Sequence, residues 1–250
     1  MHFEVVTLFP ELVRLAGRFG VVGRACERGL IGLGTTDPRD FATDVHRTVD
    51  DRPYGGGPGM VMKVEPLRSA IRVARDKLPG GSRTVFLSPH GRVFDQAVAR
   101  EYAALPGLLL VAGRYEGIDE RVLRMEADET LTVGDYVLSG GELPAMLVVD
   151  AVARLVPGVL GDEHSAVEDS FSNGLLDCPH YTRPEEVEGM RVPAVLLSGD
   201  HGAIRRWRLK QSLGRTWALR PELLAGRELS AEEQGLLDEY IAERQAAGTD

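Results

Sequence analysis

The stretch Val133-Gly134-Asp135-Tyr136-Val137-Leu138-Ser139-Gly140-Gly141-Glu142-Leu143-Pro144 is the most informative part of this chain. It comes at the end of Thr130-Leu131-Thr132-Val133, a pattern typical of a strand, and leads into an apolar segment at 143–155, typical of a helix. Glycines lack a β-carbon, so backbone groups there can approach a ligand closely. Pro144 falls in the first helical turn, where its missing N–H breaks no hydrogen bond. The pattern predicts a strand, a ligand-binding turn and a helix.

Further apolar runs continue this pattern on either side of 133–144. Strands are expected at 3–8, 84–89, 108–113 and 130–133, and helices at 10–17, 95–105 and 143–155. Strands that are apolar throughout and separated by helices predict a parallel sheet with helices on both faces. The expected fold class is therefore α/β, and this first domain is expected to span residues 1–160.

The chain changes character after residue 160. Glycine, serine and acidic residues dominate 161–173, which predicts a flexible linker. Helices are then expected at 184–187, 201–214 and 229–247. The last begins with Ser230 and Glu233 at the spacing of a capping box. Residues 174–250 are thus expected to form a small all-helical domain.

Composition indicates a soluble protein of the cytoplasm. The chain has 250 residues, of which 43% are hydrophobic and 27% charged, enough for a sizeable core. The start at Met1 lacks a basic signal-peptide region, and no apolar run approaches the ~20 residues of a membrane span. Cys26 and Cys178 form no CxxC pattern, which favours ordinary packed thiols in a reducing compartment.

The chain contains a local basic patch although its net charge is −9. Residues 201–215 carry no acid, include Trp207, and hold the cations Arg205, Arg206, Arg208, Lys210 and Arg215. Cations neutralise phosphates, and an aromatic ring can stack on an unpaired base. A solvated helix face with a core tryptophan would show the same composition, so the patch alone leaves both interpretations equal.

Three predicted strands end in polar, glycine-bearing loops, at 87–91, 112–117 and 133–141. Because ligands bind at the carboxyl ends of parallel strands, these loops are expected to form one pocket. The motifs GxxxxGK[ST], GxGxxG, HExxH and GxSxG are absent, which disfavours ATP, dinucleotide, zinc and serine-hydrolase chemistry. A second glycine-rich loop at 54–60 could wrap a large ligand or be an exposed tip.

Two polar residues outside these loops are candidates for chemistry. Asp169 lies in the acidic segment 165–171, where a carboxylate could act as a general base or simply keep a loop soluble. Arg154 lies late in the helix expected at 143–155, where it could complement the helix dipole or stabilise an oxyanion.

Six motifs in order resemble the bacterial tRNA (guanine-N1)-methyltransferase family, and the match runs from Phe3 to about Trp217. The motifs are Asp51-Arg52-Pro53-Tyr54-Gly55-Gly56-Gly57-Pro58-Gly59-Met60, Leu87-Ser88-Pro89, Gly113-Arg114-Tyr115-Glu116-Gly117-Ile118-Asp119, residues 134–144, Glu168-Asp169-Ser170-Phe171 and Pro179-His180-Tyr181-Thr182-Arg183-Pro184. This resemblance implies a SPOUT-class fold with a deep trefoil knot in the sheet. It also implies a homodimer whose active site is built across the interface.

The resemblance further implies S-adenosylmethionine as the methyl donor, held in the knot mostly by backbone groups. The matching positions are Leu87, Ser88, Pro89, Gly113, Tyr115, Glu116, Val133, Gly134, Tyr136, Leu138, Gly140, Gly141 and Pro144. The family also suggests a dependence on Mg²⁺, with Glu116 as a participant, but the sequence shows no ligand set.

The implied reaction is methylation of N1 of guanosine 37 in tRNA, with Asp169 as general base and Arg154 steadying charge on O6. Contacts to the tRNA anticodon stem-loop are expected from Gly55, Gly56, Gly57, Gly59, Asp119, Ser165, His180, Arg205 and Arg208. No DNA or membrane partner is expected. The alternatives are another SPOUT RNA methyltransferase, a non-catalytic RNA-binding module, and a Rossmann-type oxidoreductase, which the missing fingerprint disfavours.

Overall fold

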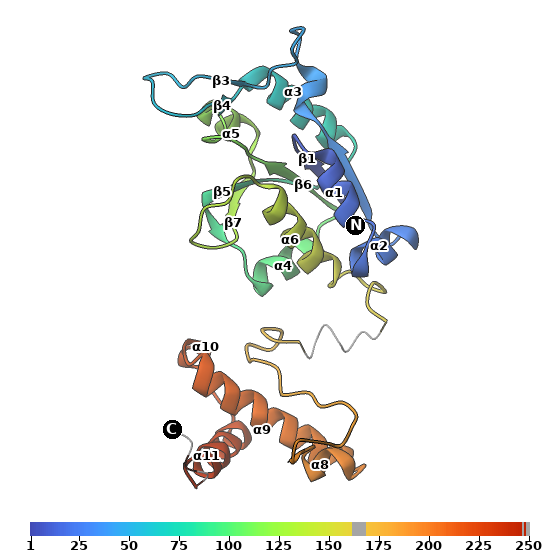
Figure 1. Cartoon of the computed structure of the whole chain (residues 1–250), viewed down its shortest axis with the longest axis vertical. Coiled ribbons are helices and arrows are strands. Elements are labelled where there is room, and N and C mark those ends of the chain that lie inside the picture. Colours follow the sequence, from blue (N-terminus) through green and yellow to red (C-terminus); the bar gives the residue numbers. More distant parts are fainter. Residues whose placement is uncertain (162–168, 247, 249–250) are drawn as a thin grey trace. The chain divides into compact units, whose positions relative to one another are not determined.

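The computed structural model describes residues 1–161, 169–246 and 248 (Figure 1). The chain forms two compact units, Met1–Glu163 and His164–Asp250. The division falls inside the segment 161–173 that the sequence marks as a linker, of which residues 162–168 lie outside the described part.

The first unit is built on a five-stranded sheet. Its strands are β1 (His2–Val6), β2 (Gly32–Thr36), β5 (Arg83–Val93), β6 (Gly107–Ala112) and β7 (Glu129–Thr132). They lie in the order β2-β1-β6-β5-β7, and every neighbouring pair is parallel. The central strand β6 is buried along its whole length, as its unbroken apolar run predicts. The predicted α/β class with a parallel sheet is confirmed.

Helices cover both faces of this sheet, as predicted. They are α1 (Pro10–Ala16), α2 (Gly20–Glu27), α3 (Val64–Asp76), α4 (Gln96–Ala103), α5 (Glu120–Glu126) and α6 (Glu142–Ala153), with a 3₁₀ turn at Pro38–Phe41 and a small hairpin of β3 (Asp50–Asp51) and β4 (Val61–Met62). Successive residues of β1 point to opposite faces. Val5 therefore packs with α1, α2, α4 and α6, whereas Val6 packs with α3 and α5.

Strand β5 is interrupted between Leu87 and Arg92. Leu87 and Arg92 both pair with Leu131, so residues 88–91 loop out of the ladder before the strand resumes. The sequence predicts a strand at 84–89 that ends in a turn; the structure instead continues it to Val93. A side chain at Gly91 would collide with the backbone of Leu131, so glycine permits this close approach.

The second unit contains α8 (Ala194–Leu197), α9 (His201–Leu219), α10 (Glu222–Ala225) and α11 (Ala231–Ala246). The predicted capping box is confirmed: the Ser230 N–H donates to Oε2 of Glu233 at 2.8 Å, and the Glu233 N–H donates to Oγ of Ser230 at 3.2 Å. Its core cluster consists of Leu175, Leu213, Leu236 and Leu237.

The helix predicted at 184–187 is wrong. Residues Glu186–Val187 form β8, which pairs in antiparallel fashion with β9 (Met190–Arg191). Between them, Glu188 and Gly189 both have positive φ, at 51° and 80°. Two such residues define the tight turn that matches the twist of a hairpin, so local turn geometry overrides the helix signal of Pro184. In the described part of the second unit, the helices thus lie between Ala194 and Ala246, and the hairpin precedes them.

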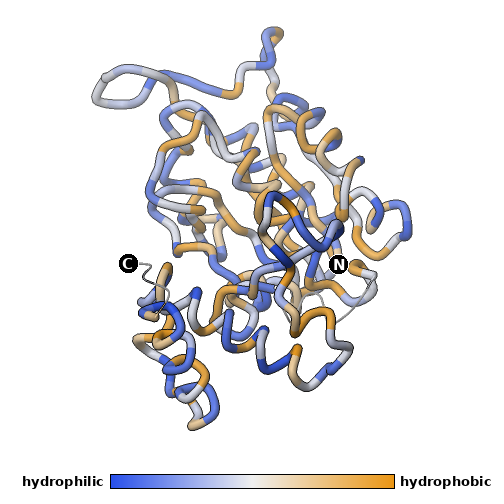
Figure 2. Tube along the Cα trace, turned by 60° about the horizontal axis from the view of Figure 1, so that its bottom comes forward, coloured by the Kyte–Doolittle hydropathy of each residue, from blue (hydrophilic) through white to orange (hydrophobic). Residues whose placement is uncertain are grey.

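Hydropathy follows this architecture. Polar and apolar residues alternate along the helical tubes in Figure 2, as expected for helices with one buried face. Among the described residues, no helix combines the length and apolar character that a bilayer crossing requires. Both cysteines are free, and burial raises the pKa of the Cys26 and Cys178 thiols, which agrees with their prediction as packed thiols.

Candidate active site

A pocket of about 390 Å³ lies at the carboxyl edge of the sheet, where the loops after β6 and β7 meet the looped-out segment of β5. These are the three loops that were predicted to form one pocket because they follow the carboxyl ends of parallel strands. Every position that the family resemblance implies for the cofactor lines it: Leu87, Ser88, Pro89, Gly113, Tyr115, Glu116, Val133, Gly134, Tyr136, Leu138, Gly140, Gly141 and Pro144. A volume of this size suits a small organic ligand.

Glycine allows two of the loops to touch through their backbones. A β-carbon on Gly141 would lie 2.6 Å from Cα of Ala112 and 3.0 Å from the backbone nitrogen of Gly113. The Gly141 N–H donates to the carbonyl oxygen of Gly113 at 2.9 Å. The loop after β7 is thereby fastened to the end of β6, and part of the pocket wall is bare backbone.

A buried charge pair crosses the same edge. Glu142, whose side chain is 1% exposed, accepts hydrogen bonds from Nε of Arg114 at 2.9 Å and from the hydroxyl of Thr7 at 2.8 Å. This pair was not predicted from the sequence, although both residues lie in the quoted motifs. The available signal was an acid at the start of an otherwise apolar helix, because a buried acid needs a partner.

The glycine-rich loop at 54–60 is attached to the pocket edge. The Glu116 N–H donates to the carbonyl of Met60 at 2.9 Å, and the Glu116 side chain lies against Gly59. Residues 55–59 are exposed, and Gly55, Gly56, Gly57 and Gly59 have positive φ. Asp119 caps α5 beside this edge, and its bond with Arg121 holds the pKa of its carboxyl below the usual range.

Arg154 lies at the other end of α6 from the pocket. It is the C-cap residue of a twelve-residue helix whose first residue, Glu142, borders the glycine loop. Twelve residues span roughly 18 Å along a helix axis, which exceeds the reach of an arginine side chain. Arg154 therefore does not meet the pocket of its own chain.

Asp169 lies in a turn of the second unit that is hydrogen-bonded to α9. Its carbonyl accepts the Ser172 N–H at 3.1 Å, and the neighbouring Ser170 hydroxyl accepts the Asp177 N–H at 2.9 Å. The Leu176 N–H donates to the buried hydroxyl of Thr216 on α9 at 2.9 Å. Ser165, also predicted as a site residue, lies outside the described residues.

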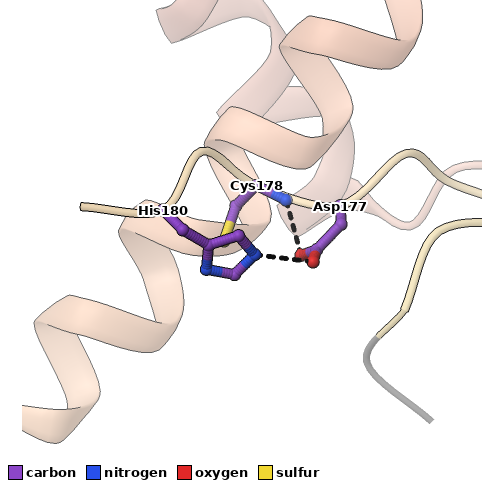
Figure 3. Close-up of side chains that lie close together, drawn as sticks. All are labelled: Asp177, Cys178 and His180. Carbon is purple, nitrogen blue, oxygen red and sulfur yellow. Dashed lines mark hydrogen bonds and ion pairs between the residues drawn. The ribbon is translucent and has the colours of Figure 1, made fainter. Parts of the chain in front are cut away.

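His180 belongs to a small polar cluster shown in Figure 3. Its Nε2 lies 2.8 Å from Oδ2 of Asp177, whose Oδ1 accepts the Cys178 N–H at 2.6 Å. In the part of the chain that the structure describes, this is the one group of three side chains close enough to hold a metal ion. It offers one carboxylate beside a thiol and an imidazole, which does not fit Mg²⁺, a cation that prefers oxygen ligands. The two hydrogen bonds to Asp177 instead indicate that this cluster holds the loop at 177–180 in its conformation.

Four of the five cations of the predicted basic patch form two pairs on α9, and the fifth, Arg215, donates to the carbonyl oxygen of Asp177 at 3.4 Å. Arg206 and Lys210 form ion pairs with Glu239 and Glu243 of α11, at 2.5 Å and 2.6 Å. Arg205 and Arg208 are exposed and form no ion pair with any described residue. On the same helix Trp207 lies 6.3 Å from the ring of Tyr181, which is half exposed. This surface offers cations and aromatic rings together.

A small-molecule pocket on a parallel sheet, together with exposed cations on a helix of the same chain, is the combination expected of an enzyme that modifies nucleic acid. The tRNA (guanine-1)-methyltransferase TrmD family model matches residues 1–226. The chain belongs to this family of methyltransferases.

Relatives support the same assignment over nearly the full length. The chain is 63% identical to a tRNA (guanine-N(1)-)-methyltransferase of Methylococcus capsulatus over 243 residues, which cover 97% of each chain. It is also 63% identical to that of Chromohalobacter salexigens, over 98% of this chain and 94% of the relative. The corresponding protein of Salmonella newport is 60% identical over 97% of this chain and 95% of the relative.

Proposed function

We propose that this chain is a cytoplasmic enzyme that transfers a methyl group from S-adenosylmethionine to N1 of guanosine 37 in tRNA. The observation that carries this proposal is the pocket: residues from three separate segments, each implied by the family for the cofactor, line one cavity. Family membership supplies the reaction class, and the relatives' names specify guanine N1 of tRNA.

The pocket suits S-adenosylmethionine in size and in surface. Its walls combine apolar side chains such as Leu87 and Leu138 with backbone of the glycine loops, and a cofactor with an adenine ring and an amino-acid tail needs both. A side chain at Gly141 would separate the loops, and one at Gly113 would contact Ile118, which also lines the cavity. When bound, the cofactor supplies an electrophilic methyl group.

Asp169 is proposed as the general base. Guanine N1 carries a proton at neutral pH and is a poor nucleophile until that proton leaves. A carboxylate in a hydrogen-bonded turn can remove it, and Arg154 can hold the negative charge that then develops on O6. Fixing both reactants in one geometry supplies much of the remaining acceleration.

The position of Arg154 supports an active site shared between two copies of the chain. The exposed face of α6 carries Leu143, Leu147 and Asp150, with Arg154 following at the next turn. Two copies of α6 packed antiparallel would bury the leucines and bring Arg154 of the partner subunit toward the pocket. Such a contact is isologous, the commonest arrangement in homodimers. Helix α1, which packs on α6, adds exposed Leu12 and Leu15 to this face.

We also propose that the sheet contains the trefoil knot of the SPOUT class. Two close backbone passages support this proposal, those of Gly91 against Leu131 and of Gly141 against Ala112. Both lie in the segments that line the pocket. Mg²⁺ at Glu116 would need its other oxygen ligands from RNA or water.

The tRNA is proposed to contact both units. Gly59 lies against Glu116 of the pocket lining, Gly55, Gly56 and Gly57 belong to the same exposed loop, and Asp119 caps α5. His180, Arg205 and Arg208 lie in the helical unit, and Ser165 lies outside the described residues. The exposed cations suit the phosphates of an anticodon stem-loop.

Methylation of an unmodified anticodon stem-loop transcript tests the proposal. With labelled S-adenosylmethionine, we expect label on N1 of guanosine 37. Asp169→Asn should lower the single-turnover rate by about 10²-fold or more, because the amide cannot accept the proton. A transcript with adenosine at position 37 is the matched control. Label on N7, on a ribose hydroxyl or on another base would instead favour a different RNA methyltransferase, and binding without transfer would favour a non-catalytic module.

A further inference from the structure

Arg114 lies at the centre of a set of contacts that the proposed chemistry does not use. Its Nε donates to Oε2 of Glu142 at 2.9 Å, and a terminal nitrogen donates to the carbonyl oxygen of Ser139 at 3.0 Å. Its guanidinium carbon lies 4.4 Å from the centre of the Phe9 ring. One side chain therefore contacts two segments that are far apart in the sequence, at Phe9 and at 139–142.

These contacts close into a ring. Oε1 of Glu142 accepts the hydroxyl of Thr7, and Oγ1 of Thr7 accepts the Phe9 N–H at 2.9 Å. Phe9 then lies under the Arg114 guanidinium. The ring joins the end of β1, the loop after β6, and the loop after β7 at the start of α6, so it ties together the elements that build the pocket edge.

The chemistry of this position favours arginine. A planar guanidinium presents donors at fixed angles to two acceptors and stacks on an aromatic ring at the same time, which an ammonium group cannot do. The Ser139 carbonyl that it holds directly precedes Gly140 and Gly141, which line the pocket. A shift of Arg114 would therefore move that wall.

We propose that Arg114 is a positioning residue for the methyl donor. Its guanidinium donates two hydrogen bonds, one to Glu142 and one to Ser139, and we call this pair of bonds the fork. The fork sets the separation between the loop at 113–117 and the loop at 133–141, and hence the width of the cofactor pocket. This inference rests on the proposed function, since it concerns the same pocket. It assigns Arg114 no contact with the transferred methyl group.

The molecule contains a matched control for this arrangement. Glu4, with a side chain that is 5% exposed, accepts the hydroxyl of Thr36 at 2.5 Å and Nζ of Lys77 at 2.7 Å. Like Glu142, it is a buried acid held by one threonine and one cation. Neither Glu4 nor Lys77 lines the pocket. Removing either cation leaves a buried carboxylate unpaired, so both changes should lower stability.

The experiment compares Arg114→Met with Lys77→Met in the full-length protein. Both variants should melt at a lower temperature, but only Arg114→Met should raise the Kd for S-adenosylmethionine, by about tenfold or more in calorimetry. Arg114→Lys restores the charge without the fork. We expect it to recover most of the melting temperature while the KM for S-adenosylmethionine stays raised and kcat at saturation stays within about threefold.

Two results would overturn the inference. Equal cofactor affinities in Arg114→Met and Lys77→Met would show that Arg114 serves stability alone. Full recovery of KM in Arg114→Lys would show that charge, rather than the fork, matters. Failure of the wild-type protein to bind S-adenosylmethionine or to methylate RNA is a separate outcome, because it overturns the proposed function itself and this inference with it.

Discussion

Two paired glutamates, one in each unit of this chain, are held in opposite ways. In the sheet unit, Glu142 is buried against Arg114 and Thr7, between loops that form a pocket. In the helical unit, Glu239 is about half exposed and pairs with Arg206 on the outside of two helices. Buried pairs are costly to disturb, whereas exposed pairs contribute little and are screened by salt.

The apolar cores of the two units also differ. The sheet unit has an apolar cluster on each face of its sheet, while the described part of the helical unit has one cluster, around Leu213. The difference suggests a division of labour, with a rigid pocket for the small ligand in one unit and a charged surface for a polyanion in the other. Changes confined to the pocket lining, or to the exposed cations of α9, should therefore act mainly on the affinity for one of the two ligands.

Gly141→Ala should have the largest effect on this comparison. The added methyl group would meet backbone atoms of Ala112 and Gly113, neither of which can rotate away, so the two loops must separate. Overpacking of this kind costs roughly 1–3 kcal/mol, and we expect a loss of S-adenosylmethionine affinity of about 10- to 100-fold in calorimetry. Filter binding of the anticodon stem-loop should change by less than about twofold, since the added methyl group leaves the cations of α9 unaltered.

Gly80→Ala is the matched control, because a β-carbon there would meet nothing within 4 Å. Cofactor affinity should then equal that of the wild type. A normal cofactor affinity in Gly141→Ala would mean that the loops can separate without altering the pocket.

The second comparison lies within the cations of α9. Replacing Arg205 and Arg208 by glutamine should weaken tRNA binding about tenfold or more and reduce the slope of log affinity against log salt by about 2, because each phosphate contact contributes nearly one. Replacing Arg206 and Lys210 in the same way should have a smaller effect, since Glu239 and Glu243 already neutralise them. Filter binding over a salt series measures both.

The two double variants carry the same change in net charge, so they separate local contact from overall attraction. Equal losses of affinity in the two would contradict a specific role for Arg205 and Arg208. Calorimetry with S-adenosylmethionine should give wild-type values for both.

Sequence alone predicted the parts of the fold with a clear apolar or β-rich pattern. The unbroken apolar run of β6 predicted that strand directly, and the β-rich runs at 3–8 and 130–133 and the mostly apolar segment at 143–155 predicted β1, β7 and α6. Strand β2, with the sequence GLGTT, was missed because an edge strand needs no apolar run and glycine weakens any propensity signal. Helix α3 was missed although its buried face, including Leu67 and Ile71, recurs at helical spacing.

The pocket could be predicted because the carboxyl ends of parallel strands meet at one edge. The pairing of Arg114 with Glu142 could not, because these residues are 28 positions apart and meet only when β6 lies beside the start of α6. The location of Arg154, by contrast, could be inferred from the sequence, because the length of α6 places Arg154 too far from the pocket of its own chain. That geometric fact, rather than any motif, argues for a shared active site.

The smallest expected effect is confined to the helical unit. Ser230→Ala removes the hydroxyl that accepts the Glu233 N–H at the start of α11, which should cost about 1 kcal/mol of unfolding free energy. Glu233 still accepts the Ser230 backbone N–H and pairs with Arg227 at 2.5 Å. Thermal unfolding followed by circular dichroism should show a lower melting temperature, with unchanged cofactor affinity.

Low pH should distinguish the contribution of Glu233 to this cap from that of the Ser230 hydroxyl. The Ser230 backbone N–H, and then Arg227, hold the pKa of the Glu233 carboxyl below its usual range. A lowered folded-state pKa stabilises the protein above the unfolded value of about 4.3, and that stability is lost as pH falls through the folded value. Ser230→Ala should keep this acid sensitivity, whereas Glu233→Gln should be less stable at pH 7 and flatter between about pH 5 and pH 3. Parallel acid curves for Glu233→Gln and the wild type would show that the cap does not couple the stability of the helical unit to pH.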